Sequence, residues 1–245
     1  MSVKAIVFVD GNWLYRNRPL LFTKLGEENG FEIDYRKLPK VLCEDLANYL
    51  DEDVDVVRTT YFGTIPSPRS GFNTAKQNAF YDFLERSCGY ETEIHEVDIG
   101  GPGEPRNDEH WVDIALASSA LYYAAQPASY DIAVVVGDDP NYAPALRRLR
   151  QLGKRVQMVG IHGADGKSIQ PDAVHLQSRT CDFPPIFLDT HAADIKLVRE
   201  MVKRKCKQCG KEEMTTWAGP DFFCSDCRGK HRVVSEANAA PEEQA

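Results

Sequence analysis

The sequence predicts an α/β protein in three layers, with a mostly parallel central sheet between helices, followed by a small cysteine-containing module. Three observations lead to this prediction. Short β-branched apolar runs alternate with segments of helical spacing over the first 160 residues, a pattern typical of a parallel sheet with helices on both faces. Four of the seven cysteines lie in a short stretch near the C-terminus. Hydrophobic residues make up 42% of the 245-residue chain, which is enough to bury a core.

Each predicted element is identified by the spacing of its apolar residues and by the residues that bound it. Residues 5–9 are apolar and largely β-branched and lead into Asp10-Gly11-Asn12, which predicts a buried strand followed by a turn. Residues 38–50 carry a leucine at every fourth position, which predicts a helix. The other predicted elements are strands at 55–62, 90–97, 132–136 and 155–159, helices at 74–86, 108–125, 142–152 and 194–205, and a Gly- and Pro-rich loop at 100–105.

Charge and cysteine content divide the chain into unlike parts. Residues 1–195 carry 19 Lys and Arg against 29 Asp and Glu, whereas residues 196–232 carry 10 against 5. We expect a first domain at 1–190, a helical linker at 191–204, a cysteine module at 205–232 and a disordered tail at 233–245. A basic module on an acidic body favours contact with polyanions, although a solvated surface is the alternative interpretation.

The expected location follows from what the sequence lacks. No apolar run approaches the roughly 20 residues that a membrane-spanning helix requires, and the N-terminus does not have the form of a secretory signal. An odd cysteine count also fits a disulfide framework poorly. We therefore expect a cytoplasmic protein with no membrane partner, and the sequence leaves its oligomeric state open.

Acidic residues follow the predicted strands at the edge where open α/β sheets bind ligands. Asp10 follows the first strand, and Asp138 and Asp139 follow the strand at 132–136. In the common strand order 3-2-1-4-5 those two strands are neighbours. Glu109 and Asp113 share one face of the helix that begins at the same edge. We therefore expect several of these carboxylates to converge.

Converging carboxylates repel one another unless a cation lies between them. Mg²⁺ or Mn²⁺ is the usual solution, and such a cation activates water and neutralises phosphate, which is the chemistry of phosphodiester cleavage. Each acid also has a purely structural interpretation. Asp10-Gly11 can be a turn, Asp108 a helix cap, and residues 138–141 a loop of turn-forming residues.

Several motifs together carry a family resemblance. Residues 7–14 read VFVDGNWL, residues 112–117 read VDIALA after Glu109, and residues 135–138 read VVGD, with YFG at 61–63 and LGKRV at 152–156. Over roughly residues 3–160 these motifs resemble, in order, those of the NYN domain family, a branch of the PIN-like metal-dependent nucleases. The resemblance implies a PIN-like, Rossmann-like three-layer fold and RNA cleavage at a carboxylate site that holds Mg²⁺ or Mn²⁺.

Carried onto this sequence, the resemblance assigns catalytic and metal-binding roles to Asp10, Asp113 and Asp138 and places Glu109 beside them in an assisting role. We expect three further residues to assist: Asn12, Asp139 and Asn141. Asn12 can orient a phosphate or a metal-bound water, and a polar turn residue is its alternative interpretation. The chain departs from the family pattern at two positions. Ser119 stands where the family often has a second acid, and Asn141 stands where its third motif has one. A catalytically weakened scaffold that binds RNA or a protein partner is therefore the alternative interpretation.

The C-terminal cysteines have the spacing of a zinc site. Cys206 and Cys209 form one CxxC pair, and Cys224 and Cys227 form a second after 14 residues. Two such pairs supply four thiolates in tetrahedral geometry for Zn²⁺, which predicts a structural zinc ribbon. The six histidines show no ligand spacing of this kind.

Basic residues and three aromatic residues, Trp217, Phe222 and Phe223, are interleaved around the cysteine pairs. Phosphate contacts together with base stacking suit single-stranded nucleic acid, and protein docking is the alternative. We therefore expect a metal-dependent endoribonuclease that cleaves RNA phosphodiester bonds, with a zinc ribbon that helps to capture single-stranded RNA. The sequence does not exclude DNA as the substrate, because no motif reads a 2′-hydroxyl.

Overall fold

The computed structural model describes residues 2–25, 32–98, 111–137, 139–162, 181–198, 201–217 and 219–228. The chain divides into two compact units, Met1–Leu197 and Val198–Ala245. This division falls within the segment that the sequence predicts as a linker. The loop predicted at 100–105 and the tail predicted at 233–245 lie outside the described residues. No helix in the described ranges is long and apolar enough to cross a membrane.

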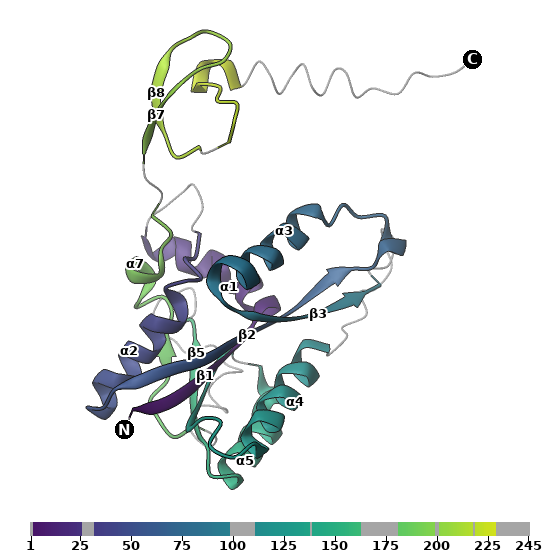
Figure 1. Cartoon of the computed structure of the whole chain (residues 1–245), viewed down its shortest axis with the longest axis vertical. Helices are drawn as coiled ribbons and strands as arrows, with labels where there is room; N and C mark the ends of the chain where they lie inside the picture. Colours follow the sequence, from purple (N-terminus) through teal and green to yellow (C-terminus); the bar gives the residue numbers. More distant parts are fainter. Residues whose placement is uncertain are drawn as a thin grey trace. The chain divides into compact units, whose positions relative to one another are not determined.

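The first unit is built on a six-stranded sheet in which every neighbouring pair of strands is parallel. The strand order is β3-β2-β1-β4-β5-β6. It contains the order 3-2-1-4-5, on which the expected convergence of the carboxylates depends, and β6 extends the sheet beyond β5. Figure 1 labels β1, β2, β3 and β5 of this sheet. The strands are β1 (Val3–Asp10), β2 (Val54–Pro66), β3 (Glu91–Val97), β4 (Ile132–Val136), β5 (Arg155–Gly160) and β6 (Ile186–Phe187).

Helices cover both faces of the sheet, as the alternating pattern predicts. Alternate residues of β1 face two separate apolar cores. Val7 and Val9 pack toward α1 and α2, and Ile6 and Phe8 pack toward α4 and α5. Within the described residues the α-helices are α1 (Gly11–Leu25), α2 (Leu38–Leu50), α3 (Ala75–Phe83), α4 (Trp111–Ala125), α5 (Ala143–Gln151) and α7 (Ala192–Ile195). A π-helical turn, η2 (Leu84–Cys88), continues α3.

The helix α1 differs from the predicted turn after the first strand. It begins directly at Gly11, because Asp10 Oδ1 accepts a hydrogen bond of 2.8 Å from the backbone N–H of Trp13 and so caps the helix. Only glycine fits at position 11, since a Cβ there would lie 2.2 Å from the ring of Tyr61. Asp10 and Gly11, which predict a turn from the sequence, therefore form the N-terminus of a helix.

The prediction of a helix at 194–205 is wrong. The helix α7 ends at Ile195, and Lys196 is extended, with φ −68° and ψ 132°. Residues Val202–Lys205 form strand β7, which pairs antiparallel with β8 (Glu212–Thr215). The pairing wins over helix propensity because it closes a hairpin around the first cysteine pair, where the N–H of Cys206 donates to Lys211 O at 2.8 Å.

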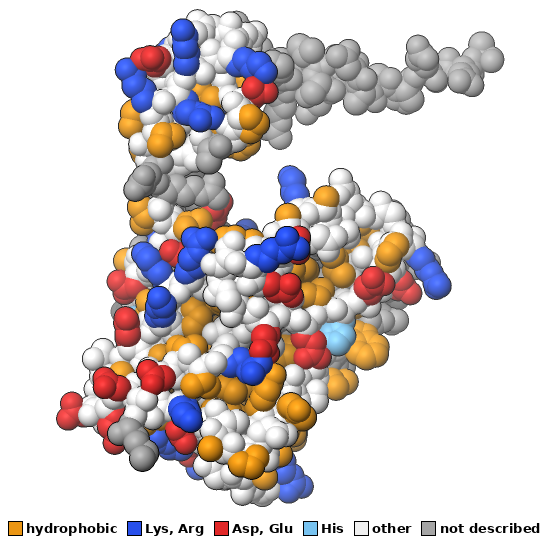
Figure 2. All heavy atoms as spheres, viewed as in Figure 1, with side chains coloured by type: hydrophobic (Ala, Val, Ile, Leu, Met, Phe, Trp, Pro, Cys, Tyr) orange, Lys and Arg blue, Asp and Glu red, His pale blue; other side chains and the backbone are white. Residues whose placement is uncertain are grey.

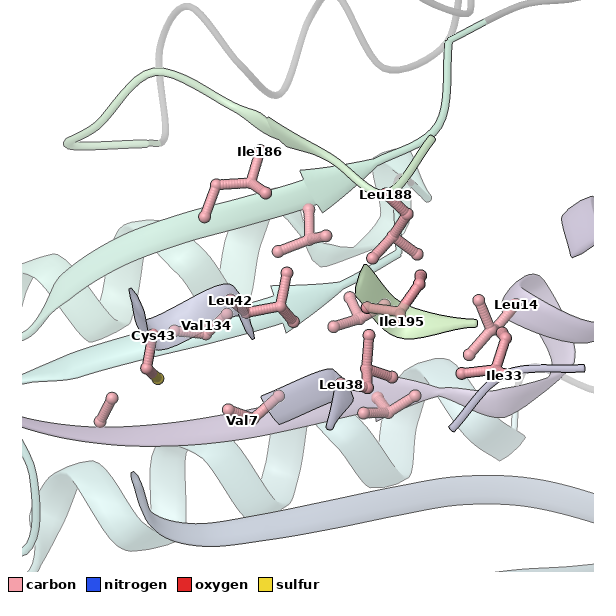
Figure 3. Close-up of a cluster of buried hydrophobic side chains, with 14 of the residues drawn as sticks. Val7, Leu14, Ile33, Leu38, Leu42, Cys43, Val134, Ile186, Leu188 and Ile195 are labelled. Carbon is pink, nitrogen blue, oxygen red and sulfur yellow. The ribbon is translucent and has the colours of Figure 1, made fainter. Parts of the chain in front are cut away.

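The last residues of the first unit are tied into its core. The Ile195 side chain is fully buried and lies among Leu14, Ile33 and Leu38 (Figure 3). The backbone N–H of Asp34 donates to Ile195 O, and the N–H of Leu197 donates to Glu32 O, both at 2.8 Å. The unit therefore needs the chain to continue to about residue 197.

We predict that a chain ending at Leu197 is more stable than a chain ending at Ala193. The shorter chain loses the burial of Ile195, about 1.5–3 kcal/mol, and two backbone hydrogen bonds of about 1 kcal/mol each. Urea unfolding followed by circular dichroism should therefore give it a free energy of unfolding lower by roughly 4 kcal/mol. Equal midpoints for the two chains would contradict the proposed anchoring role of Ile195.

Candidate active site and cysteine cluster

Among the predicted carboxylates that the structure describes, Asp10 is the most deeply buried. It ends β1, is only 2% exposed, and uses both carboxylate oxygens within the fold. Oδ1 accepts the Trp13 N–H at 2.8 Å, and Oδ2 accepts the Tyr142 hydroxyl at 2.5 Å. Burial raises the pKa of this carboxyl, the two hydrogen bonds lower it, and the charge of Asp113 raises it further.

Tyr142 is the central partner of Asp10 and was not predicted as a site residue. It ends the short helix η3 (Pro140–Tyr142) and is fully buried. Burial raises its pKa first, followed by the charge of Asp10 and then by the charges of Asp113 and Asp139. The phenol therefore stays protonated and donates to Asp10, and three carboxylates act on this one hydroxyl group.

Gly137 allows the end of β4 to pass close to Asp10. Its φ of 152° is a conformation that other residues rarely adopt, and a Cβ at this position would lie 3.2 Å from the Asp10 Cβ and 3.3 Å from the Tyr142 ring. The backbone N–H of Gly137 donates to Val159 O at 3.0 Å, which ties this turn to β5. A larger residue at position 137 would separate Asp10 from Tyr142.

Asp113, Asn141 and Asp139 lie beside this pair. Asp113 is in the first turn of α4, and its Oδ2 accepts a hydrogen bond of 3.3 Å from Asn141 Nδ2. The Oδ1 of Asp139 accepts the backbone N–H of Asn141 at 2.8 Å, so this carboxylate shapes the start of η3. Asn141 therefore joins the loop after β4 to the acid on α4.

Asn12 holds the first turn of α1 against β2. Its Nδ2 donates to Thr64 Oγ1 at 3.1 Å, and its Oδ1 accepts the Thr64 backbone N–H at 3.3 Å. Because both ends of the amide bind Thr64, Asn12 fixes the helix that Asp10 caps. The predicted site residues Glu109 and Asp138 lie outside the described residues, and their roles stay predictions.

A second group of polar residues, also missed in the sequence, lies along β3 and α4. Glu93 is in register with Phe62, which is in register with Asp10. The Ser119 hydroxyl donates to Glu93 Oε2 at 3.1 Å, and His95 Nε2 lies 3.5 Å from Glu93 Oε1. The alternation of Glu91, Glu93 and His95 along the strand was the available signal, because alternate residues share one face of a strand.

A histidine–carboxylate pair follows the two strands β5 and β6 at one edge of the sheet. The backbone N–H of His162 donates to Asp189 Oδ1 at 3.0 Å, and its Nδ1 lies 3.0 Å from Asp189 Oδ2. The His162 ring stacks on Phe187 with 3.7 Å between the ring centroids. Because the two residues are 27 positions apart, no local spacing in the sequence indicated this pair.

The four predicted zinc ligands are brought together in the second unit. The sulfur atoms of Cys206, Cys209, Cys224 and Cys227 all lie within 4.8 Å of one another, and those of Cys209 and Cys224 are 3.6 Å apart. A tetrahedral site with Zn–S bonds of about 2.3 Å places its sulfur atoms roughly 3.8 Å apart. The cluster therefore fits Zn²⁺ without rearrangement of the backbone.

The thiol pKa values differ across this cluster. The backbone N–H of Cys224 is the largest contribution that lowers the pKa of Cys206 to about 6. Burial, followed by the neighbouring thiols, raises the pKa of Cys227 to about 12. Zinc binds thiolates, so metal binding must release protons.

The surroundings of the cysteines differ in part from the basic and aromatic surface that the sequence suggested. Phe222 is buried against the cysteines, whereas Trp217 is 49% exposed. Lys and Arg side chains are spread over the visible face of this unit (Figure 2). Three of the lysines pair with acids: Lys203 with Glu212, Lys207 with Asp221 and Lys211 with Asp226.

Comparison with known proteins gives one family and a distant structural likeness. The family model described as the NYN domain matches residues 4–178. The crystal structure of a protein of unknown function from Vibrio parahaemolyticus is 18% identical, with a TM-score of 0.50 over 80% of this chain and 97% of that chain. This likeness supports the fold. Comparison with curated proteins gives no match.

A second solved structure is too different to support an inference. The nicotinamidase SaPncA from Staphylococcus aureus is 12% identical, with a TM-score of 0.27 over 76% of this chain and 98% of that chain.

We predict one Zn²⁺ per chain, held by the four cysteines. Cys206→Ser should release the metal, because a hydroxyl is a much weaker zinc ligand than a thiolate. Cys88→Ser, which changes a thiol in the first unit, is the matched control and should keep the metal. Elemental analysis of the purified variants measures both. Equal zinc content in the two variants would contradict this assignment.

Proposed function

The chain belongs to the NYN domain family, and from this membership we propose that it is a metal-dependent endoribonuclease that cleaves phosphodiester bonds in single-stranded RNA. Membership of this family suggests a nuclease. The observation that carries the finer proposal is the buried Asp10 carboxylate, positioned by two hydrogen bonds and close enough to Asp113 for its charge to raise the Asp10 pKa. We further propose that the zinc ribbon assists in holding the RNA.

The donor set fits a hard divalent cation. Asp10, Asp113 and Asn141 offer carboxylate and amide oxygens, which are ligands that Mg²⁺ and Mn²⁺ prefer. A cation would also offset the two effects that raise the Asp10 pKa, its burial and the charge of Asp113. Asp10 and Asp113, with Asp138 as the third predicted ligand, would hold the metal. When bound, it would activate water and neutralise charge on the phosphate.

The surrounding residues keep the carboxylates in place for this role. Tyr142 holds one Asp10 oxygen, and the start of α1 holds the other. The contact between Asn12 and Thr64 fixes that helix start to β2. Side chains that are fixed before the metal binds lose less conformational freedom on binding, which favours affinity.

The second candidate function is a catalytically weakened scaffold that binds RNA or a protein partner. One observation favours it. Asn141 stands where the family has an acid, and Asp139 is the acid that could take its place. The Asp139 carboxylate already accepts the Asn141 N–H at the start of η3, so one of its oxygens is used in the fold. Incubation of the pure protein with labelled single-stranded RNA and DNA, in Mn²⁺ or EDTA, separates the candidates. RNA cleavage in Mn²⁺ supports the nuclease, and binding without cleavage in any metal supports the scaffold.

We predict that Asp10→Asn abolishes Mn²⁺-dependent RNA cleavage and leaves the protein folded. An amide keeps the cap on Trp13 but removes the anionic ligand. The folded state raises the Asp10 pKa. Ionisation of Asp10 therefore lowers the free energy of unfolding of the wild type as the pH rises through the interval between the unfolded and folded pKa values. The metal-free variant should therefore melt at the same or a higher temperature than the wild type above that interval.

Asp51→Asn is the matched control for this substitution. Asp51 is exposed at the C-terminal end of α2, and its φ of 55° suits asparagine. The control should cleave RNA like the wild type. Cleavage by Asp10→Asn at the rate of this control would refute the site.

We predict that Asn141→Asp lowers the Mn²⁺ concentration needed for half-maximal cleavage. The substitution replaces an amide that donates to Asp113 with a further negative charge. Without metal the added repulsion should lower the melting temperature, and bound Mn²⁺ should restore it. Titration of cleavage against Mn²⁺ measures the change, and loss of activity would mean that the neutral amide is required.

We predict that removal of residues 198–245 weakens RNA binding and makes it less dependent on salt. The removed segment includes residues 198–232, which carry 9 Lys and Arg against 5 Asp and Glu, and each lost phosphate contact lowers the log–log salt slope by roughly 0.7 for single strands. Titration of a chain ending at Leu197 at several salt concentrations gives both quantities. Unchanged affinity and slope would instead favour protein docking as the role of the ribbon.

A further inference from the structure

An exposed tryptophan lies at the start of the helix that carries Asp113. Trp111 is the first residue of α4, and 47% of its surface remains exposed. Its ring stacks on the ring of His95, with 5.8 Å between the centroids and 21° between the planes. A large apolar ring that is half exposed while packed on a second ring is held in place and can still be reached by a ligand.

A polar group lies behind this ring pair. The Ser119 hydroxyl, two turns further along α4, donates to Glu93 Oε2 at 3.1 Å, which ties β3 to α4. His95 Nε2 lies 3.5 Å from Glu93 Oε1 and makes no hydrogen bond within the described residues. The Trp111 ring is therefore held by stacking on a side chain of a strand that this hydrogen bond fixes to α4, so less freedom is lost when a ligand packs on it.

The ring and the candidate metal ligands flank the same helix end. Trp111 and Asp113 are about 3 Å apart along the helix axis. Val112 between them is buried and faces the core. Trp111 therefore lies on the β3 side, against His95, and Asp113 lies on the η3 side, against Asn141. A polynucleotide that crosses this helix end would meet the ring and the acids together.

We propose that Trp111, supported by His95, is the platform on which a nucleobase adjacent to the cleaved phosphodiester stacks. The proposal rests on the proposed nuclease function and extends it to substrate selection. Base stacking is available to every base, but it requires a base released from a duplex. The platform therefore selects single-stranded RNA without reading its sequence. It also supplies affinity that does not depend on charge, which matters because residues 1–195 carry a net charge of −10.

The test compares Trp111→Leu with Trp111→Phe. Leucine keeps an apolar side chain and removes the ring, whereas phenylalanine keeps a ring. Tyr122→Leu is the matched control, because Tyr122 is 63% exposed near the other end of α4. Binding is measured without added Mg²⁺ or Mn²⁺ and without a chelator, so that the RNA is not cleaved and the zinc ribbon keeps its metal, by fluorescence anisotropy of a short labelled single-stranded RNA. The same RNA is then used with a single abasic site moved through each position.

Trp111→Leu should bind the RNA about tenfold more weakly, which is within the range measured for loss of one base stack. Trp111→Phe should lose less, and Tyr122→Leu should bind like the wild type. One abasic position should weaken wild-type binding by a similar factor and have no effect on Trp111→Leu. A fully paired RNA should show no difference between Trp111→Leu and the wild type.

Equal affinity of Trp111→Leu and Tyr122→Leu would overturn the platform, as would abasic effects that are identical in the wild type and in Trp111→Leu. Absence of RNA binding by the wild type would overturn it as well. Cleavage in Mn²⁺ is measured separately on the same variants. RNA that is cleaved with no Trp111-dependent base effect refutes only the platform. A base effect without cleavage in any metal refutes the nuclease and with it the place of the base beside a cleaved phosphodiester, and leaves Trp111 as an RNA-binding ring.

Discussion

The site depends on one unfavourable placement, a carboxylate buried at the junction of β1 and α1. Burial of a charged group costs free energy unless hydrogen bonds or an opposite charge offset it. Asp10 receives two hydrogen bonds, from the Trp13 N–H and the Tyr142 hydroxyl, and its pKa is still raised. The protein itself therefore offsets only part of the cost. A bound cation would offset the rest of the cost of burying this carboxylate. The buried Asp10 therefore lowers the stability of the metal-free protein and at the same time favours metal binding.

A carboxylate buried at this position needs hydrogen-bond donors and room for close packing, and the residues around Asp10 provide both. Gly11 leaves room for the Tyr61 ring, and Gly137 leaves room for Asp10 itself. Tyr142 reaches Asp10 across 132 positions of sequence, because β1 and β4 are parallel neighbours and end at the same edge. The parallel sheet thus converts strand ends that are distant in sequence into one site, and small residues at those ends allow the close approach.

The sequence predicted the framework better than the contacts within it. The helix at 38–50 and the strand at 132–136 have the predicted bounds, because regular apolar spacing reflects burial in the core. The start of α1 was not predictable from its turn-forming residues, since a tertiary contact and a cap decide it. The helix expected at 194–205 is replaced by a hairpin closed around cysteines. The roles of Tyr142 and Glu93 depend on long-range contacts that no local spacing encodes.

If the negatively charged first unit binds RNA, as proposed, its affinity must come from something other than its net charge. Residues 1–195 carry a net charge of −10, so their average field repels a polyanion. Three features can offset this repulsion: a cation at the carboxylates, the Lys and Arg side chains of residues 196–232, and an uncharged stacking surface such as Trp111. The first two weaken as salt rises, whereas stacking depends on salt much less. The balance between them can therefore be measured, because the affinity that persists at high salt reports the contribution of the aromatic surface.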